Sequence, residues 1–174
     1  MKSSIRKRII AWGFPSALVF ALVWHFLPLT MNCSPSVPVG LYWLTADPNA
    51  PYLTFCMSRE LLTEAMAHGY EPLHGRCPGG TAWILKPNLE HAQEVTFSSR
   101  GFVIDHRMLP NTAPLARDRF GRALPHFPFG RYRVSSKEVW VVSSYNKRSY
   151  DSRYFGPISR SSIVSYARPL LVFP

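Results

Sequence analysis

Residues 94–104 read Glu-Val-Thr-Phe-Ser-Ser-Arg-Gly-Phe-Val-Ile, a pattern that recurs along most of the chain. Two short runs of β-branched and aromatic residues, 94–97 and 101–104, predict two strands around a Gly-containing turn. Similar runs between Pro, Gly, Asn or Asp residues span 40–44, 51–55, 82–85, 138–143 and 163–173, the last one interrupted at Pro169. Sixteen Pro and ten Gly residues argue against a helical bundle. We therefore expect a mainly β fold.

The composition limits the class of protein. With 174 residues, the chain has room for one domain and one appendage. Hydrophobic residues make up 47% and charged residues 17%, which excludes a disordered or collagen-like chain. The net charge of +10 suggests an anionic partner, and eight basic residues against two acidic ones lie in 100–137. We interpret this stretch as a basic face near anionic lipid headgroups, with nucleic acid as the weaker alternative.

The first 30 residues predict a membrane anchor. Residues 1–8 carry four basic side chains and no acidic one, and residues 9–29 contain no Asp, Glu, Lys or Arg. As a helix, this run would be about 30 Å long, enough to span a bilayer. The positive-inside rule then keeps 1–8 in the cytoplasm and places 30–174 outside it. A cleaved signal peptide is the competing interpretation, but its usual Ala-x-Ala site is missing around 27–34.

Such a location permits disulfide bonds. Cys56 and Cys77 bracket residues 58–68, whose apolar residues have helical spacing and which begin with Ser58 as a plausible N-cap. We expect a small helical insertion that a Cys56–Cys77 bridge ties to the main body. Two separately buried thiols are the alternative. With three Cys residues and no Cys-x-x-Cys pair, we expect no metal site.

Three segments carry candidate chemistry. Pro35 and Pro38 stiffen the backbone around Ser36, directly after the apolar run. Lys86 ends an apolar strand; it either reaches solvent or, if it points inward, desolvation lowers its pKa and makes it a general base. No His has an obvious role as a partner for the serine, so a Ser-Lys dyad needs fewer coincidences. In the third segment, 143–157, Asp151 and Arg153 would pair on one face of an extended chain.

Together these segments resemble the bacterial type I signal peptidases. The resemblance rests on Ser36-x-Pro38, on a lysine at the end of an apolar strand, and on Ser149-x-Asp151-Ser152-Arg153-x-x-Gly156 in that order. The TraF branch of conjugative-transfer signal peptidases is the closer match, through residues 32–42, Cys77-Pro78-Gly79-Gly80 and Phe120-Gly121-Arg122-x-Leu124-Pro125. The likeness covers nearly all of the chain from residue 30.

The resemblance implies a β-sheet peptidase domain that cleaves exported proteins after small residues. It assigns Ser36 as the nucleophile and Lys86 as the general base, while Ser34 and the Ser36 backbone N–H would form the oxyanion hole. Asp151, Ser152 and Arg153 would support the active site. Two features depart from the family pattern: Cys33 beside the nucleophile, and residues 87–94 where the family continues toward a Gly-Asp turn.

We therefore expect a membrane-anchored serine endopeptidase of the bacterial inner membrane, with its catalytic domain in the periplasm and no cofactor. Its substrate would be an exported precursor, such as a propilin or another conjugation component. The alternatives are a general type I signal peptidase and a non-catalytic, basic assembly factor of a secretion channel. Nucleic acid is not an expected partner, because the basic residues would face away from the cytoplasm.

Overall fold

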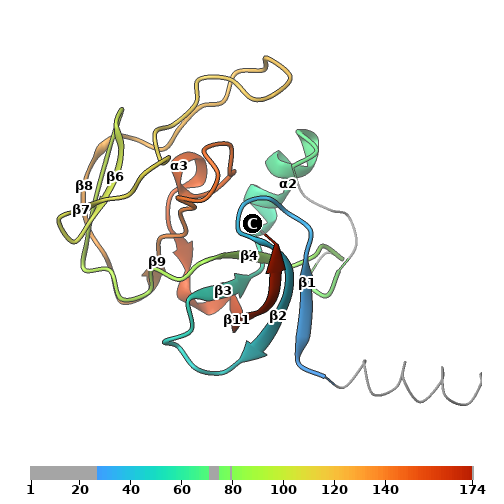
Figure 1. The fold of residues 1–174 in the computed structure, drawn as a ribbon. Helices are drawn as coiled ribbons and strands as arrows, with labels where there is room; N and C mark the ends of the chain where they lie inside the picture. Colours follow the sequence, from blue (N-terminus) through green and yellow to red (C-terminus); the bar gives the residue numbers. More distant parts are fainter. Residues whose placement is uncertain (1–26, 71–74, 79, 174) are drawn as a thin grey trace, which may run out of the picture.

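A five-stranded antiparallel sheet forms the base of the molecule (Figure 1). The computed structural model describes residues 27–70, 75–78 and 80–173. The strand order is β1-β2-β11-β3-β4, so β1 and β4 are the two edge strands. The bounds are β1 Leu29–Asn32, β2 Val39–Thr45, β3 Tyr52–Phe55, β4 Ile84–Pro87 and β11 Ile163–Phe173.

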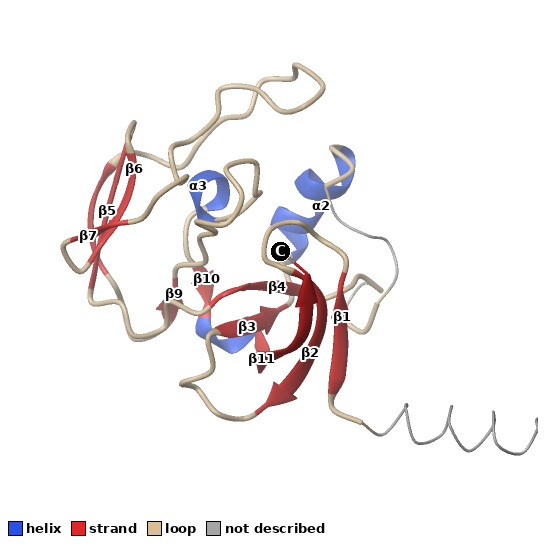
Figure 2. Ribbon diagram, in the orientation of Figure 1, coloured by secondary structure: helices blue, strands red, loops and turns tan. Residues whose placement is uncertain are grey.

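A second antiparallel sheet lies apart from the first, as Figure 2 shows on its left side, and has the order β7-β6-β5-β8. Its strands are β5 Glu94–Ser98, β6 Gly101–Ile104, β7 Arg107–Met108 and β8 Gly130–Arg133. Alternating residues of β5 and β6, among them Val95, Phe97 and Phe102, are buried in one core cluster with Trp140. The mainly β class expected from the sequence is therefore confirmed, and the strands predicted at 94–97 and 101–104 are present.

Residues 138–142 pass between two cores. Val139 and Val141 belong to a cluster with Leu53 and Phe55 of the first sheet, whereas Trp140 and Val142 belong to the cluster of the second sheet. The predicted strand 138–143 was wrong in extent: only β9 Glu138–Val139 forms a ladder, with β10 Ile158–Ser159. Beyond Val139, the backbone N–H groups of Val141 and Ser143 donate to the side chains of Ser152 and Asp151 instead of to a neighbouring strand. The short helix α3 Ser152–Phe155 and the 3₁₀ turn η1 Arg160–Ser162 complete this region.

The small helical insertion is confirmed. Helix α2 Arg59–Ala67 lies between β3 and β4, and the Ser58 side chain accepts a hydrogen bond from the Leu61 N–H as the N-cap. Gly69 follows the helix with a φ of 66°, a conformation that glycine adopts without steric cost. Cys56 and Cys77 form the expected disulfide bond, and Cys33 is a free, exposed thiol.

The predicted membrane segment 9–29 lies largely outside the described residues. Its last residue, Leu29, is the first residue of strand β1, so a helix extending to that position was wrong. Pro28 precedes it and disfavours a helical conformation at Leu27. Within the part of the chain that the structure describes, no helix is long and apolar enough to cross a membrane.

Candidate functional site

Ser36 and Lys86 line the same cavity, which has a volume of about 840 Å³. They come from different elements: Ser36 lies in the loop between β1 and β2, and Lys86 lies in β4. The neighbouring residues Val37 and Leu85 pack in one buried cluster. This shared core brings the two predicted dyad residues to one site.

The Ser36 loop is held in shape by side chains around it. The Asn32 Nδ2 donates hydrogen bonds to the carbonyl oxygens of Ser34, Val37 and Pro38 at 2.8, 3.2 and 3.0 Å. The Tyr42 hydroxyl donates to the Pro38 carbonyl at 2.6 Å. Burial raises the pKa of Tyr42 to about 12, so this phenol keeps its proton. The Asn32 side chain therefore holds the conformation of this loop, a role that was not predicted from the sequence.

Ser34 contacts Ser36 in two ways. The Ser34 Oγ donates to the Ser36 Oγ at 3.2 Å and accepts the Ser36 backbone N–H at 3.3 Å. The two groups expected to form an oxyanion hole are therefore adjacent and bonded to each other. Ser36 itself is largely buried, with 9% of its surface exposed.

Lys86 points inward and not to solvent, since only 2% of the residue is exposed. Its Nζ donates a hydrogen bond to the Ser149 Oγ at 2.7 Å. Burial disfavours the charged form of an amine. Ser149 belongs to the motif of residues 149–156 but was given no role from the sequence; its position two residues before Asp151 was the available signal.

Asp151 and Arg153 form a completely buried ion pair, with neither side chain exposed. The Arg153 Nε and Nη2 donate to the two carboxylate oxygens of Asp151, each at 2.8 Å. Burial opposes the charge of Arg153, but the hydrogen bonds and attraction of Asp151 raise its pKa above the ordinary value. The expected pairing is present. The expected extended segment was wrong beyond Asp151, because Ser152–Phe155 form α3 and Asp151 is its N-cap.

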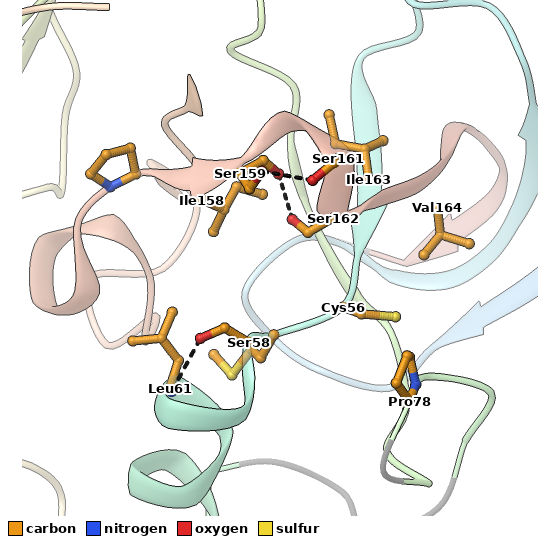
Figure 3. Close-up of a pocket in the computed structure, with 12 residues that line it drawn as sticks. Cys56, Ser58, Leu61, Pro78, Ile158, Ser159, Ser161, Ser162, Ile163 and Val164 are labelled. Carbon is orange, nitrogen blue, oxygen red and sulfur yellow. Dashed lines mark hydrogen bonds between the residues drawn. The ribbon is translucent and has the colours of Figure 1, made fainter. Parts of the chain in front are cut away.

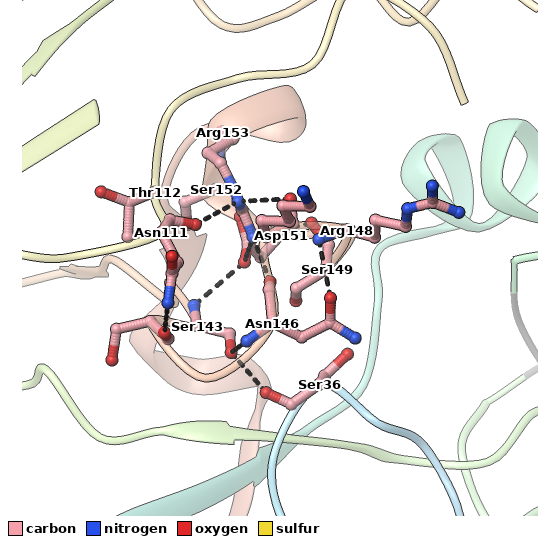
Figure 4. Close-up of polar contacts among 12 residues, drawn as sticks. Ser36, Asn111, Thr112, Ser143, Asn146, Arg148, Ser149, Asp151, Ser152 and Arg153 are labelled. Carbon is pink, nitrogen blue, oxygen red and sulfur yellow. Dashed lines mark hydrogen bonds and ion pairs between the residues drawn. The ribbon is translucent and has the colours of Figure 1, made fainter. Parts of the chain in front are cut away.

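This ion pair organises the segment that carries Ser149. Arg153 also donates to the backbone carbonyls of Asn146, Lys147 and Ser149, at 3.3, 2.9 and 3.0 Å. The Ser152 Oγ accepts the Val141 N–H at 2.9 Å, and an Asp151 oxygen accepts the Ser143 N–H at 3.0 Å. Figure 4 shows this network above Ser36.

The network reaches the Ser36 loop directly. The Ser143 hydroxyl donates to the Ser36 carbonyl oxygen, and the Asn146 Nδ2 donates to the Pro35 carbonyl at 3.2 Å. Ser36, Lys86, Ser149 and the Asp151–Arg153 pair thus belong to one connected site. Such a site offers a hydroxyl, a buried amine and fixed hydrogen-bond donors, the groups that acyl transfer requires.

A second cavity of about 480 Å³ lies beside the disulfide bond (Figure 3). Its hydroxyl groups are already engaged: Ser162 donates to the Ser159 carbonyl, and the Ser159 and Ser161 hydroxyls bond to each other. No His, Lys, Asp or Glu lines it among the described residues. Across the same described ranges, no group of His, Cys, Asp and Glu side chains is arranged to hold a metal ion.

Comparisons with known proteins identify the family of the chain. The family described as signal peptidase, peptidase S26, matches residues 92–171. A plasmid transfer protein TraF of Escherichia coli is 32% identical over 170 residues, which cover 95% of this chain and 96% of that protein. A second from the same species is 33% identical, over 98% of this chain and 99% of its own. A conjugal transfer protein TraF of Agrobacterium fabrum is 35% identical over 82% of both chains. No solved structure matches.

Proposed function

Since this chain belongs to the TraF family of plasmid and conjugal transfer proteins and contains a signal peptidase S26 region, we propose that it is a serine endopeptidase of conjugative transfer. The observation that carries the proposal is the buried Lys86, which lines the same cavity as Ser36 and hydrogen-bonds to Ser149. A buried amine is suited to accept a proton at neutral pH, and no histidine lines this cavity among the described residues.

In the proposed mechanism, the Ser36 Oγ attacks the scissile carbonyl carbon while the Lys86 Nζ takes the hydroxyl proton. The negative charge on the carbonyl oxygen is stabilised by the Ser36 N–H and the Ser34 hydroxyl, which must turn from each other toward it. The C–N bond then breaks, and Lys86 returns the proton to the leaving amine. Water, or an amine of the substrate, attacks the resulting ester and frees Ser36.

The proposed substrate is an exported precursor protein, a propilin or another component of conjugation. A segment of the precursor would enter the 840 Å³ cavity that Ser36 and Lys86 line. We also propose that the part of the apolar run that precedes β1 anchors the chain in the inner membrane, with residues 1–8 in the cytoplasm and the β-sheet domain in the periplasm. A reporter that is active only outside the cytoplasm, fused after Pro174, should then be active.

The dyad is tested by precursor processing in membranes that carry matched amounts of each variant. Ser36→Ala and Lys86→Ala should each lower the rate by roughly 10³-fold or more, and the double variant should be no worse, because the two groups act as one unit. Lys86→Arg should be equally inactive, since a guanidinium does not release its proton.

The controls are the exposed Ser99→Ala and Lys137→Ala, which should process the precursor normally. Substantial processing by Ser36→Ala would overturn the assignment of the nucleophile. Conjugative transfer that survives Ser36→Ala but not deletion of the chain would instead favour the non-catalytic assembly role.

A further inference from the structure

The cavity that contains Ser36 and Lys86 is bordered by an excess of positive charge. Four exposed basic residues contribute to its lining: Arg117, Arg119, Lys147 and Arg148. None of the four forms an ion pair with a carboxylate among the described residues. Four like charges around one cavity repel one another, and an anionic group placed between them would be attracted.

Asp118 is the acidic residue on the described part of the cavity wall, and its charge is compensated by the ion pair with Arg122. Asp118 accepts hydrogen bonds from the Tyr70 hydroxyl at 2.7 Å and from the Arg122 Nε at 2.6 Å. The backbone N–H groups of Phe120 and Arg122 also donate to its carboxylate. Among the described residues of the cavity wall, the charge that is free to attract a ligand is therefore positive.

Both cationic segments are built rigidly. Residues 147 and 148 lie in the turn whose carbonyl oxygens the buried Arg153 holds, and the Arg148 N–H is bonded to Asn146 Oδ1 at 2.8 Å. Figure 4 shows the Arg148 side chain pointing away from the Asp151–Arg153 pair. This turn ends at Ser149, the partner of Lys86.

The second cationic segment is the tip of the long loop between β7 and β8. Asp118 and its partners Tyr70 and Arg122 fix this tip against the end of α2, because Arg122 Nη2 also donates to the His68 carbonyl at 2.9 Å. The Arg119 guanidinium lies 4.6 Å from the centre of the Phe120 ring. Cations on loops whose backbone is already fixed bind an anion with little loss of backbone freedom.

We propose that this cavity selects precursors with an acidic side chain close to the cleaved bond, and that Lys147, Arg148 and Arg119 bind its carboxylate. This substrate preference rests on the proposed peptidase function. A peptide fits better than a lipid surface, because the four cations line a concave cavity shared with Ser36 and not a flat face. Arginine and lysine bind carboxylates through charge-assisted hydrogen bonds.

The test uses the full chain in detergent with Ser36→Ala, so that binding is measured without turnover. The probes are fluorescent alanine-based peptides that differ only in one residue, Glu or Gln, placed at successive positions. At the best position, the Glu peptide should bind about fivefold to tenfold more tightly than the Gln peptide, and the difference should shrink as salt is added.

Adding Lys147→Gln and Arg148→Gln should abolish the preference for the Glu peptide. Arg119→Gln, in the loop between β7 and β8, should reduce this preference. The matched control, Arg100→Gln with Lys137→Gln, removes two exposed cations that do not line the cavity and should leave the preference intact. Lys147→Glu with Arg148→Glu should reverse the preference, in favour of a Lys peptide.

Equal binding of the Glu and Gln peptides at every position would overturn the proposal. It would also be overturned if the variants lost binding to phosphatidylglycerol vesicles while the preference among peptides stayed. Cleavage of the precursor is measured separately, with the chain that retains Ser36. Cleavage without a Glu preference refutes only this substrate selection, whereas a Glu preference without cleavage refutes only the peptidase function.

Discussion

At the scale of single residues, the hydrogen bond between Lys86 Nζ and Ser149 Oγ fixes where the amine lies. A lysine side chain has four rotatable bonds, and a base that is displaced from its substrate by about 1 Å can lose roughly 10²-fold in rate. Ser149 is thus a positioning residue for the proposed reaction, because it acts through Lys86.

Ser149→Ala removes this hydrogen bond and should lower kcat for precursor cleavage by about tenfold to hundredfold, with little change in KM. Ser149→Thr keeps a hydroxyl and should recover part of the rate. The half-buried Ser144, whose backbone carbonyl accepts the Asn111 side chain, provides the control Ser144→Ala. A kcat for Ser149→Ala equal to that of the control would show that Lys86 needs no positioning from this residue.

Asp151→Asn should destabilise the fold. The substitution leaves the Arg153 guanidinium buried with its countercharge removed, and breaking a buried pair in this way costs about 3–5 kcal/mol. We expect a lower midpoint in urea unfolding and lower activity, because Arg153 also holds the turn that carries Ser149. The exposed pair between Arg168 and Asp47 is the control, since Asp47→Asn should change the midpoint little. Equal midpoints for the two variants would contradict this account.

Sequence patterns pointed to residues that the structure brings together, but not to their contacts. Ser36, Lys86, Asp151 and Arg153 could be chosen from their motifs, and all of them lie in one connected site. The burial of Lys86 and its contact with Ser149 depend on side chains 63 positions apart, which no local pattern encodes.

Among the larger elements, the tip of the long loop between β7 and β8, residues 116–124, is held in shape by the carboxylate of Asp118. Burial raises the pKa of Asp118, but hydrogen bonds from Tyr70 and Arg122 and from backbone N–H groups outweigh it and lower that pKa well below its ordinary 3.8. A depressed folded-state pKa means that Asp118 stabilises the tip above pH 3.8 and loses this contribution as the pH falls further.

We therefore expect amide exchange in residues 116–124 to become faster, relative to the two sheets, as the pH falls below about 4, after correction for intrinsic exchange rates. Asp118→Asn should show fast exchange in this segment already at neutral pH and should lose the acid dependence. An equally steep acid dependence in Asp118→Asn would assign the effect to another group.

The elements predicted best from the sequence were those with strong local signals. The helix capped at Ser58 and the strands at 94–97 and 101–104 match the structure closely. The segment 138–143 has the composition of a strand, but the Ser152 hydroxyl accepts the Val141 N–H and the Asp151 carboxylate accepts the Ser143 N–H. Strand β1 was missed because residues 29–32 adjoin the apolar run and carry no strand signal of their own. They become a strand by pairing with residues 40–43 of β2.

At the scale of the whole molecule, the site lies where two parts of the structure meet. The five-stranded sheet provides Ser36 and Lys86, whereas the segment that leaves the second sheet provides Ser149, Asp151 and Arg153. The hydrogen bond from Ser143 to Ser36 joins residues 107 positions apart. The site therefore requires the complete fold. This explains why its residues could be chosen from motifs while its geometry could not.

The proposed anchor gives a prediction for the whole chain. Every element from β1 onward begins after residue 28, so a chain that starts at Leu27 should keep the site. On a soluble peptide it should match the full chain in kcat/KM. On a precursor held in the same membrane, the full chain should be faster by about tenfold or more, because confinement to one plane raises the effective concentration of the substrate.

Replacing residues 9–26 with an unrelated apolar helix provides the control and should restore the faster rate, since only confinement is required. The measurement is precursor processing in proteoliposomes at equal amounts of protein. A shortened chain that processes the membrane-bound precursor as fast as the full chain would show that the N-terminal segment does not serve to confine the enzyme with its substrate. Failure of the shortened chain on the soluble peptide as well would instead show that residues 1–26 contribute to the site itself.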